Sequence, residues 1–440
     1  MVRIGPMASP KFLLNRRELM VGLGAAALGS ARSPIVMAQG RPALALQLKT
    51  GDISLRPGGP ETQVWSIAGP DFRLKRGEVI EIGVGNELPV PAVLNWRGID
   101  GAAAAEPLTG RPPIAPGGRD TFQIAPRHAG TYLYDANLLG DGQSRPSRAC
   151  ALIVRENENV AVDRDEVFLI EDWRLRPDGT AIAPGLDTKD ATPLYTINGR
   201  TSLDVSVRAN QRLRTRFINA SQRAVIAVKL ENTDVRVMAL DGQPAEPFQA
   251  RNGALVLAPG GRADAFVDAT GPAGSAAAIL LHDGREPRPI GRLVISSEPP
   301  IRAALLPPAA PLPSNGLPPQ LDLKNAQRFE VPLGGLQADW TAPARFATND
   351  PLAFRAGRTV VLALTNPGAI ATVFHLHGHH FRLLDRLDDG WKPFWLDTLA
   401  VEPGQTQRIA FLAEYPGRWL IESVATDWAA PRLVRWYNVA

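Results

Sequence analysis

Three stretches of the chain alternate apolar and polar residues in the same way. They are RLKRGEVIEIGVGN from Arg73 to Asn86, SVRANQRLRTRFIN from Ser206 to Asn219, and AFRAGRTVVLALTN from Ala353 to Asn366. In each, a basic residue precedes a Gly or Asn turn, alternating apolar residues follow, and the run ends in Asn. Alternation with a period of two is typical of a half-buried β-strand. The pattern therefore predicts three copies of one strand-containing unit.

A second set of turns follows these runs. APGGR begins at Ala115 and again at Ala258, and EPGQT begins at Glu402, so the turns recur about 143 residues apart. After the first and third turns the chain reaches AGTYLY at Ala129 and PGRWLI at Pro416, each a turn that leads into an aromatic-rich strand. Repeats of this length, made of several short strands, indicate an all-β chain of three similar Greek-key β-sandwich domains.

The composition agrees with many short strands. The 40 Gly and 40 Pro residues are spread along the chain, which favours turns over long helices. The segment from Ser296 to Gln320 is rich in Pro, cannot form a β-ladder, and is predicted to be a stiff connector. The predicted domains are residues 42–156, 160–297 and 322–440, with the Pro-rich linker at 298–321.

The N-terminus has the pattern of an export signal. Arg16 and Arg17 precede a mildly apolar Gly/Ala stretch, Arg32 follows, and a small-residue cleavage site ends at Ala38. The apolar stretch is about 11 residues long, whereas a membrane-spanning helix needs about 20. Residues 1–38 therefore resemble a twin-arginine (Tat) signal peptide, which predicts a periplasmic protein with no membrane span in its mature form. The alternative is a helix kept as an uncleaved anchor.

Removal of that segment changes the charge balance. Residues 1–38 carry five basic residues and Glu18, a net charge of +4, and the whole chain is also +4. The mature protein is therefore close to neutral, and neither nucleic acid nor an anionic membrane is expected as a partner. Cys150 is the only cysteine, so no intrachain disulfide can form. Its apolar surroundings, ACALIV, predict a buried small hydrophobic residue.

Four of the six histidines lie within six positions of the motif TVFHLHGHHF, which starts at Thr372. These are His375, His377, His379 and His380. Together with FHLHGHHFRLLDR, the segments DTLAVEPGQTQRIAF, YPGRWLI, GTYLYDAN, NWRGIDG, ALDGQP and LAPGGRADAFVD resemble the multicopper oxidases. The resemblance covers essentially the whole mature chain and implies three consecutive cupredoxin-like domains.

The resemblance also implies where copper ligands are expected. In that family ten His and one Cys hold four coppers, a blue copper and a trinuclear cluster. Most of these positions have changed here. The family's His-Trp-His-Gly is replaced by Asn95-Trp96-Arg97-Gly98, its Tyr-His-x-His by Tyr134-Asp135-Ala136-Asn137, and its His-Cys-His by Glu422-Ser423-Val424, with Thr372 and Trp428 at two further His positions. Only His375 and His377 remain.

These replacements predict that the blue copper cannot bind. Thr372, Ser423 and Trp428 supply no thiolate or imidazole, which a blue copper site requires. In the trinuclear region, Arg97 and Asp135 are expected to form an ion pair beside Val424, where a copper would have been held. Asn95 and His375 alone offer too few ligands for another metal.

A residual site remains as an alternative. Asn137, His377 and Glu422, with His375 nearby, could hold at most one copper or zinc ion through nitrogen and oxygen ligands. Otherwise His375 and His377, on one face of a strand, hydrogen-bond Glu422, Asn137 or Asp135. His379 and His380 are expected to face solvent or to form local hydrogen bonds, and His128 to be a turn residue.

Two functions from different classes follow. The first is a non-catalytic periplasmic scaffold or binding protein without a cofactor, whose partners are envelope proteins. It resembles a copper-free, Tat-exported protein of the same fold that supports bacterial cell division. The second is a metal-binding protein or oxidoreductase that uses one metal at His375, His377 and Glu422. A binding module for a small ligand in a cleft between domains one and three is a third possibility.

Overall fold

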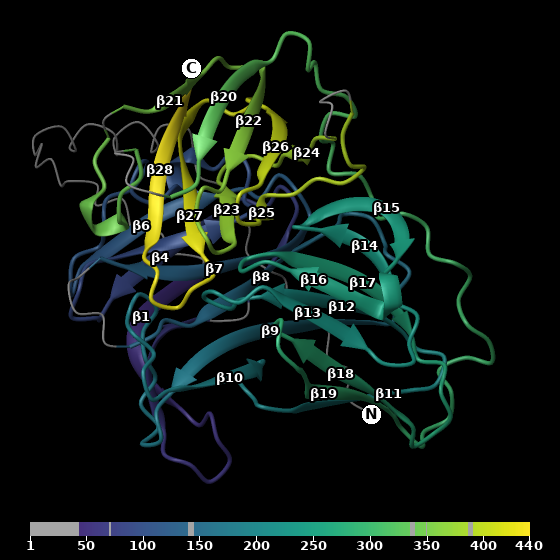
Figure 1. The fold of residues 1–440 in the computed structure, drawn as a ribbon. Coiled ribbons are helices and arrows are strands. Elements are labelled where there is room, and N and C mark those ends of the chain that lie inside the picture. The colour runs from purple at the N-terminus through teal and green to yellow at the C-terminus, as the bar shows by residue number, and fades with distance from the viewer. Residues whose placement is uncertain (1–43, 70–71, 140–144, 335–338, 349, 386–389) are drawn as a thin grey trace, which may run out of the picture. The chain divides into compact units, whose positions relative to one another are not determined.

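The computed structural model describes residues 44–69, 72–139, 145–334, 339–348, 350–385 and 390–440. The predicted signal peptide, residues 1–38, lies outside these residues. Within them the chain forms strands and three short 3-10 helices (Figure 1), and none of these helices is long and apolar enough to cross a membrane. The prediction of an all-β fold is therefore confirmed.

The first domain packs two four-stranded sheets, in the orders β2-β1-β4-β6 and β3-β8-β7-β5. Its strands are β1 (Leu44–Ile53), β2 (Thr62–Ala68), β3 (Phe72–Lys75), β4 (Ile80–Asn86), β5 (Ala92–Arg97), β6 (Arg119–Ile124), β7 (Gly130–Leu138) and β8 (Ala149–Arg155), with the 3-10 helix η1 (Ala103–Ala105). Buried aromatic residues such as Trp96 and Tyr132 join the two sheets in one core. Cys150 packs against this core but is half-buried, where its apolar surroundings predicted a buried residue.

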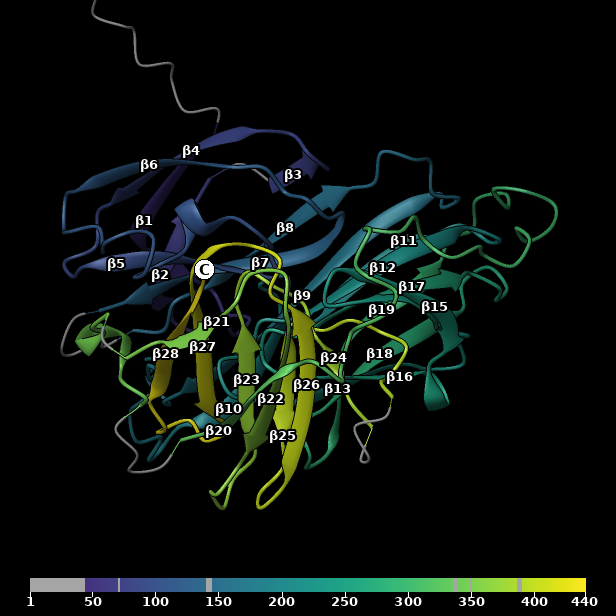
Figure 2. The same cartoon turned by 90° about the horizontal axis from the view of Figure 1, so that it is seen from above.

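The second domain has a six-stranded sheet, β10-β9-β12-β17-β14-β15, and a five-stranded sheet, β11-β19-β18-β13-β16. Figure 2 shows these teal and green strands. They are β9 (Arg164–Leu175), β10 (Thr192–Ile197), β11 (Leu203–Val207), β12 (Arg212–Asn219), β13 (Ile226–Leu230), β14 (Arg236–Leu240), β15 (Gln243–Gln249), β16 (Ala254–Leu257), β17 (Arg262–Asp268), β18 (Ala276–His282) and β19 (Pro287–Ile295), with η2 (Arg251–Gly253).

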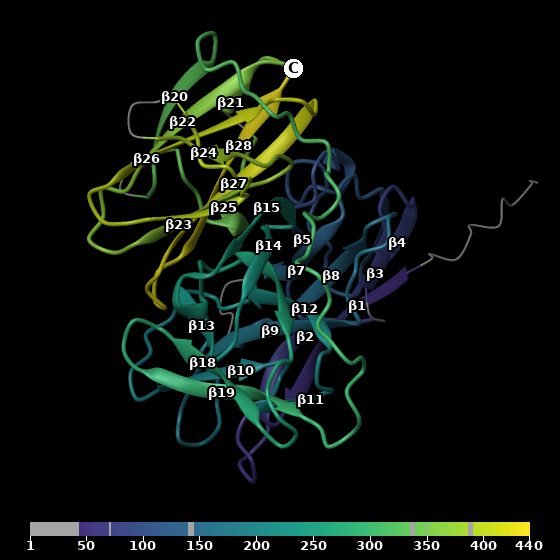
Figure 3. The ribbon, with the colours of Figure 1, turned by 90° about the vertical axis from the view of Figure 1, so that its right-hand side faces the viewer.

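The third domain repeats the plan with sheets β20-β22-β26-β24 and β21-β28-β27-β23-β25 (Figure 3). The strands are β20 (Gln327–Pro332), β21 (Leu352–Phe354), β22 (Thr359–Thr365), β23 (Thr372–Leu376), β24 (Arg382–Leu383), β25 (Thr398–Val401), β26 (Thr406–Leu412), β27 (Gly417–Ala425) and β28 (Arg432–Val439), with η3 (Pro343–Arg345). Trp419 and Phe411 are fully buried in its core.

The repeated sequence runs have one structural role in all three domains. Asn86 and Asn219 end β4 and β12, Asn366 directly follows β22, and the three buried side chains make equivalent contacts. In each case Nδ2 donates to two backbone carbonyls and Oδ1 accepts the backbone N–H two residues later. Each Asn backbone also pairs with the APGGR or EPGQT turn. The two sequence repeats are thus the two halves of one hydrogen-bonded corner.

The Pro-rich segment forms no strand and is held by side chains of the first two domains. Arg76 donates to the carbonyls of Ser314 and Asn315, and Arg208 donates to that of Pro299. Asn315 is buried and exchanges hydrogen bonds with the backbone of Ala129. The segment is therefore held at several points while most of its residues stay exposed, and the domain limits given above stay a prediction.

Candidate functional site

The candidate site is formed where strands of the first and third domains present buried polar side chains. Strand β5 pairs with β7 so that Asn95 lies opposite Asp135, and β23 pairs with β27 so that His375 lies opposite Glu422. Opposite residues of an antiparallel pair share one face of the sheet. All four side chains are less than a tenth exposed. The pleat of the two sheets therefore explains why residues distant in sequence meet here.

Glu422 is fully buried and is the centre of the site. Its Oε1 accepts from Asn95 Nδ2 at 2.9 Å and lies 3.3 Å from His377 Nε2. Its Oε2 accepts from Arg97 Nη2 at 3.1 Å. Burial alone would raise the pKa of Glu422, but Arg97, Arg432 and His377 hold it well below its usual range. Glu422 is therefore an ionised carboxylate surrounded by donors.

The predicted pair of Arg97 and Asp135 is present, with Arg97 Nη2 3.6 Å from Asp135 Oδ2. A second cation, Arg432, enters the same site and was not predicted. Its Nη1 lies 2.5 Å from Asn137 Oδ1, 3.4 Å from Asp135 Oδ2 and 3.7 Å from Glu422 Oε2. Arg432 lies opposite Val424 in the pairing of β27 with β28. That pairing brings Arg432 into the site, and the sequence alone does not show it.

His377 bridges two carboxylates, with Nδ1 2.8 Å from Glu106 Oε1 and Nε2 on Glu422. Burial alone would lower its pKa, but the carboxylates of Glu106 and Glu422 raise the pKa of His377 to about 10. It is therefore an imidazolium at neutral pH, and a protonated ring nitrogen cannot bind a metal. Glu106, which also accepts the Leu420 N–H, was not predicted as a partner.

His375 makes a different contact from those expected. Its Nδ1 lies 2.8 Å from Thr398 Oγ1, and that hydroxyl donates to Asp397, so His375 donates to Thr398. Burial and the neighbouring Arg97 hold the pKa of His375 well below its usual range, which leaves the ring neutral. The expected hydrogen bond to Glu422, Asn137 or Asp135 is thus made by His377 and not by His375.

The positions that the resemblance assigns to a blue copper carry structural side chains. Trp428 Nε1 donates to the Ala183 carbonyl at 3.1 Å, and the Arg174 guanidinium lies over its ring at 4.6 Å. Thr372 and Ser423 are buried, and the Thr372 hydroxyl is 3.4 Å from the Ile370 carbonyl. No thiolate or imidazole is among these three residues, so they do not fit a copper of this type.

The trinuclear positions do not fit three metal ions either. The cavity beside them has a volume of only about 20 Å³, and its lining includes Arg97, Asp135, His375, Val424 and Arg432. This is room for about one water molecule. Two guanidinium groups point into the region, and they repel divalent cations. The donor set and the space both disagree with a copper cluster.

The four residues of the predicted residual site are brought near one another but bind other groups. Glu422 contacts Asn95, Arg97 and His377, Asn137 contacts Arg432, and His375 contacts Thr398. A single metal at His375, His377, Glu422 and Asn137 stays a prediction. It requires that His377 lose its proton and that Asn137 leave Arg432.

Two of the other buried histidines correct an expectation. His379 and His380 do not face solvent, since each is 2% exposed, whereas His128 lies in a bend before β7, as predicted, and is also buried. His379 donates through Nδ1 to the Tyr437 hydroxyl at 2.8 Å and accepts the Tyr415 N–H at Nε2. Its contacts are therefore hydrogen bonds to strands and turns distant in sequence, and burial lowers the pKa of His379 to about 4.

His380 and His128 meet Asp100 of the first domain. His380 Nδ1 and His128 Nδ1 lie 2.8 and 3.2 Å from Asp100 Oδ2, while His380 Nε2 donates to the Asp241 carbonyl at 2.9 Å. Within the described ranges, this is the only group of three His, Cys, Asp or Glu residues whose donor atoms all lie within 4.8 Å. Gln243 Nε2, a hydrogen-bond donor, lies 3.1 Å from His128 Nδ1, so an amide group already contacts the nitrogen that a metal ion would need.

The contact between His380 and Asp100 is stabilised by protonation of the His380 ring. Burial opposes protonation, but Asp100 and Asp397 raise the pKa of His380 to about 9. Behind His380, Arg262 binds Asp397 through Nη1 and Nη2 at 2.8 and 2.6 Å. The result is a buried ionic network that connects residues from all three domains. It was missed because its members are up to 280 residues apart.

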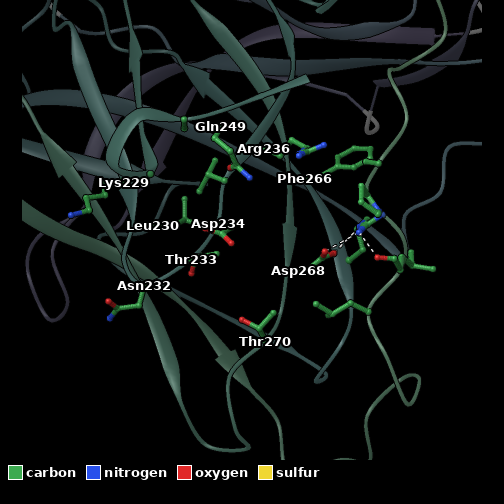
Figure 4. A pocket seen from close by; sticks show the side chains of 18 of the residues that line it. Lys229, Leu230, Asn232, Thr233, Asp234, Arg236, Gln249, Phe266, Asp268 and Thr270 are labelled. Carbon is green, nitrogen blue, oxygen red and sulfur yellow. Dashed lines mark hydrogen bonds and ion pairs between the residues drawn. The ribbon is translucent and has the colours of Figure 1, made fainter. Parts of the chain in front are cut away.

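Another hollow lies on the second domain, away from Glu422. It is a groove of about 990 Å³ between the β13–β14 turn, β15 and the Pro-rich segment. Figure 4 shows side chains that line it, such as Asn232, Thr233 and Gln249. Arg212 on one wall is bound by both carboxylate oxygens of Asp268 and by the Leu306 carbonyl. Because its buried charges already have partners, this groove offers no evident chemistry.

The three β-sandwich domains and the relic of a ligand set define a cupredoxin-like protein of a particular class. Sequence profiles described as multicopper oxidase match residues 51–159, 164–278 and 320–440. The chain therefore belongs to the multicopper oxidase family.

Individual relatives agree with this assignment. The multicopper oxidase MmcO of Mycobacterium tuberculosis is 27% identical over 414 residues, covering 81% of this chain and 78% of that protein. Copper resistance protein A of Pseudomonas syringae pv. tomato is 24% identical, covering 53% of this chain and 49% of its own length.

Solved structures show the same fold. A multi-copper oxidase from Pseudomonas thermotolerans superposes with a TM-score of 0.77 at 24% identity, covering 90% of this chain and 98% of that one. Lac15, from a marine microbial metagenome, gives a TM-score of 0.75 at 25% identity, covering 90% of this chain and all of that one (100%). The predictions of the family and of its cupredoxin-like fold are confirmed.

Proposed function

We propose that this protein is a copper-independent member of its family that acts by binding other molecules rather than by oxidising them. The observation that carries the proposal is the closed charge network around Glu422. Arg97, Arg432 and His377 supply the positive charge there, and Glu422, Asp135 and Glu106 supply the negative charge. Fixed cations at these positions replace the charge of a metal and need no cofactor.

The compartment and the partners are part of the same proposal. The twin-arginine pattern of residues 1–38 supports export to the periplasm, and the near-neutral mature chain supports a protein partner of the envelope over nucleic acid. A role in cell division or envelope maintenance rests on the resemblance to a copper-free exported protein of this fold. Co-purification of division proteins supports it, and normal division of a deletion strain under envelope stress contradicts it.

The decisive test is elemental analysis of the mature protein purified from the periplasm, before and after incubation with copper and with zinc. We expect far less than one metal ion per chain and no oxygen consumption with phenolic substrates. A copper-replete multicopper oxidase treated in parallel is the positive control. Several coppers per chain with blue colour would overturn the proposal.

A second candidate is a protein that uses one metal ion. The approach of His377 Nε2 to 3.3 Å from Glu422 Oε1 favours it, as do the copper-related names of the relatives. One tightly held zinc or copper per chain, lost in His377→Gln, would support this function. Because the His377 imidazolium competes with metal, uptake is then expected to increase as the pH rises towards 10.

A further inference from the structure

A cleft of about 440 Å³ lies between the second and third domains, and Glu422 is not among the residues that line it. Its second-domain wall comes from β9, β10, β13 and the turn between β18 and β19. Ala371, Glu402 and Thr426 of the third domain form the other wall. A volume of this size is typical of sites for small molecules.

Three arginines line this cleft: Arg174, Arg223 and Arg285. None of them forms an ion pair with a carboxylate among the residues the structure describes. Four other arginines of the second domain are paired with carboxylates: Arg212 with Asp268, Arg214 with Asp264, Arg216 with Asp165 and Arg292 with Asp204. The cleft therefore gathers three guanidinium groups that form no direct ion pair, although the buried carboxylate of Asp172 lies near Arg174 and Arg223.

Arg223 is the most informative of the three, because it is only 3% exposed. Its Nη1 and Nη2 donate to the carbonyls of Gln222 and Ala430, and its Nε has no partner in the described structure. Burial and the nearby Arg432 lower the pKa of Arg223 to about 10, a sign that its charge is incompletely compensated. A buried arginine without a carboxylate partner is costly and indicates that an anion completes the site.

The other groups in the cleft define the shape of that anion. Arg174 is fixed by its own contacts, a hydrogen bond to the Trp173 carbonyl at 3.0 Å and the stacking on Trp428. Pro193, Val225 and Val256 contribute apolar surface, and Val256 is 72% exposed. Asp283 is already bound by Tyr195 and Arg288. Glu402 is exposed and is the one acidic side chain that competes with a ligand for the arginines.

We propose that this cleft binds a small organic molecule that carries carboxylate or phosphate oxygens next to an apolar body. The guanidinium groups of Arg174, Arg223 and Arg285 bind the oxygens, since arginine matches such groups with paired hydrogen bonds. The apolar side chains contact the body of the ligand. This inference rests on the proposed binding function, and none of the residues that line the cleft stands at a copper-ligand position.

The test is calorimetric titration of the full mature protein with benzoate, succinate, phenyl phosphate and inorganic phosphate, with benzamide as the uncharged analogue of benzoate. We expect at least one of the anions to bind and benzamide not to bind. Stronger binding of succinate and benzoate identifies the oxyanion as carboxylate, and stronger binding of the phosphates identifies it as phosphate.

Variants distinguish anion binding in this cleft from non-specific attraction of anions to the protein surface. Arg223→Gln and Arg285→Gln should each weaken binding at least tenfold, and Glu402→Gln should strengthen it severalfold by removing the competing carboxylate. Arg292→Gln removes the same charge from an exposed pair in the same domain and should leave affinity unchanged. If Arg223→Gln does not fold, Arg285→Gln, on an exposed turn, still gives the result.

Two outcomes would overturn the site. One is the absence of binding by all four anions, and the other is an equal loss of affinity in Arg292→Gln. Metal content measured on the same samples is independent of this result. If the protein binds anions and also contains copper, the proposed copper independence is rejected and the anion site is retained. If the protein is metal-free and binds no anion, the anion site is rejected and copper independence is retained.

Discussion

Glu422 shows how one buried carboxylate can organise several charged and polar side chains. Its carboxylate contacts Asn95 and His377 through Oε1 and Arg97 through Oε2. Arg432 also lies near Oε2. Each cation depends on the carboxylate, because a buried charge is tolerated only where it is paired and hydrogen-bonded. The positions are thus coupled, and a change at one of them affects all the others.

Glu422→Gln should therefore destabilise the protein strongly. It leaves Arg97 and Arg432 short of negative charge in a buried site, which costs about 3–5 kcal/mol. Urea unfolding followed by tryptophan fluorescence measures the change. Glu402→Gln, the same substitution at an exposed position, should alter stability by less than about 0.5 kcal/mol. Equal effects of the two variants would mean that the network contributes nothing to stability.

His377 gives a test of protonation at the same scale. Its pKa in the folded protein, about 10, lies above the ordinary histidine value of about 6.5. The stability that its charge contributes is fully present below pH 6.5 and is lost as the pH rises through about 10. Nitrogen-15 NMR of the ring should show an imidazolium at pH 8. A neutral ring at that pH would contradict the assigned ion pairs with Glu106 and Glu422.

At the scale of elements, the repeated corner is what the sequence predicted best. The Asn that ends each repeated run and the Gly-containing turn behind it are close enough in sequence for a pattern to reveal both. Within the site, the Arg97–Asp135 pair could be predicted because both residues replace expected ligands. Arg432, Glu106 and Asp100 could not, because none occupies a ligand position and their contacts depend on strand pairing and on how the domains meet.

Asn219→Ala tests the corner. The substitution leaves the carbonyls of Ala224 and Leu257 and the Ser221 N–H without their partner, and we expect a loss of about 2–3 kcal/mol. Asn86→Ala and Asn366→Ala should have similar effects, because their contacts are the same. Thermal unfolding measures all three, with Asn159→Ala, at an exposed position outside the strands, as the control. A neutral result in every domain would show that the repeat has no structural role.

At the scale of the whole molecule, His380 connects the three domains. It extends from the third domain to Asp100 of the first and to the Asp241 carbonyl of the second. The Arg262–Asp397 pair beside it also joins the second and third domains. Buried ionic contacts of this kind couple domains, so that the loss of one allows the domains to unfold separately.

The coupling should depend on pH in a defined direction. The pKa of His380 is raised to about 9 in the folded protein, so its contribution is complete below pH 6.5 and declines as the pH rises through about 9. Scanning calorimetry should show one unfolding transition at pH 6 and a broadened or split transition at pH 9.5. His380→Gln should show the split at both pH values, whereas His282→Gln, at an exposed position, should behave as the wild type. A single transition of unchanged width in His380→Gln would mean that apolar contacts alone couple the domains.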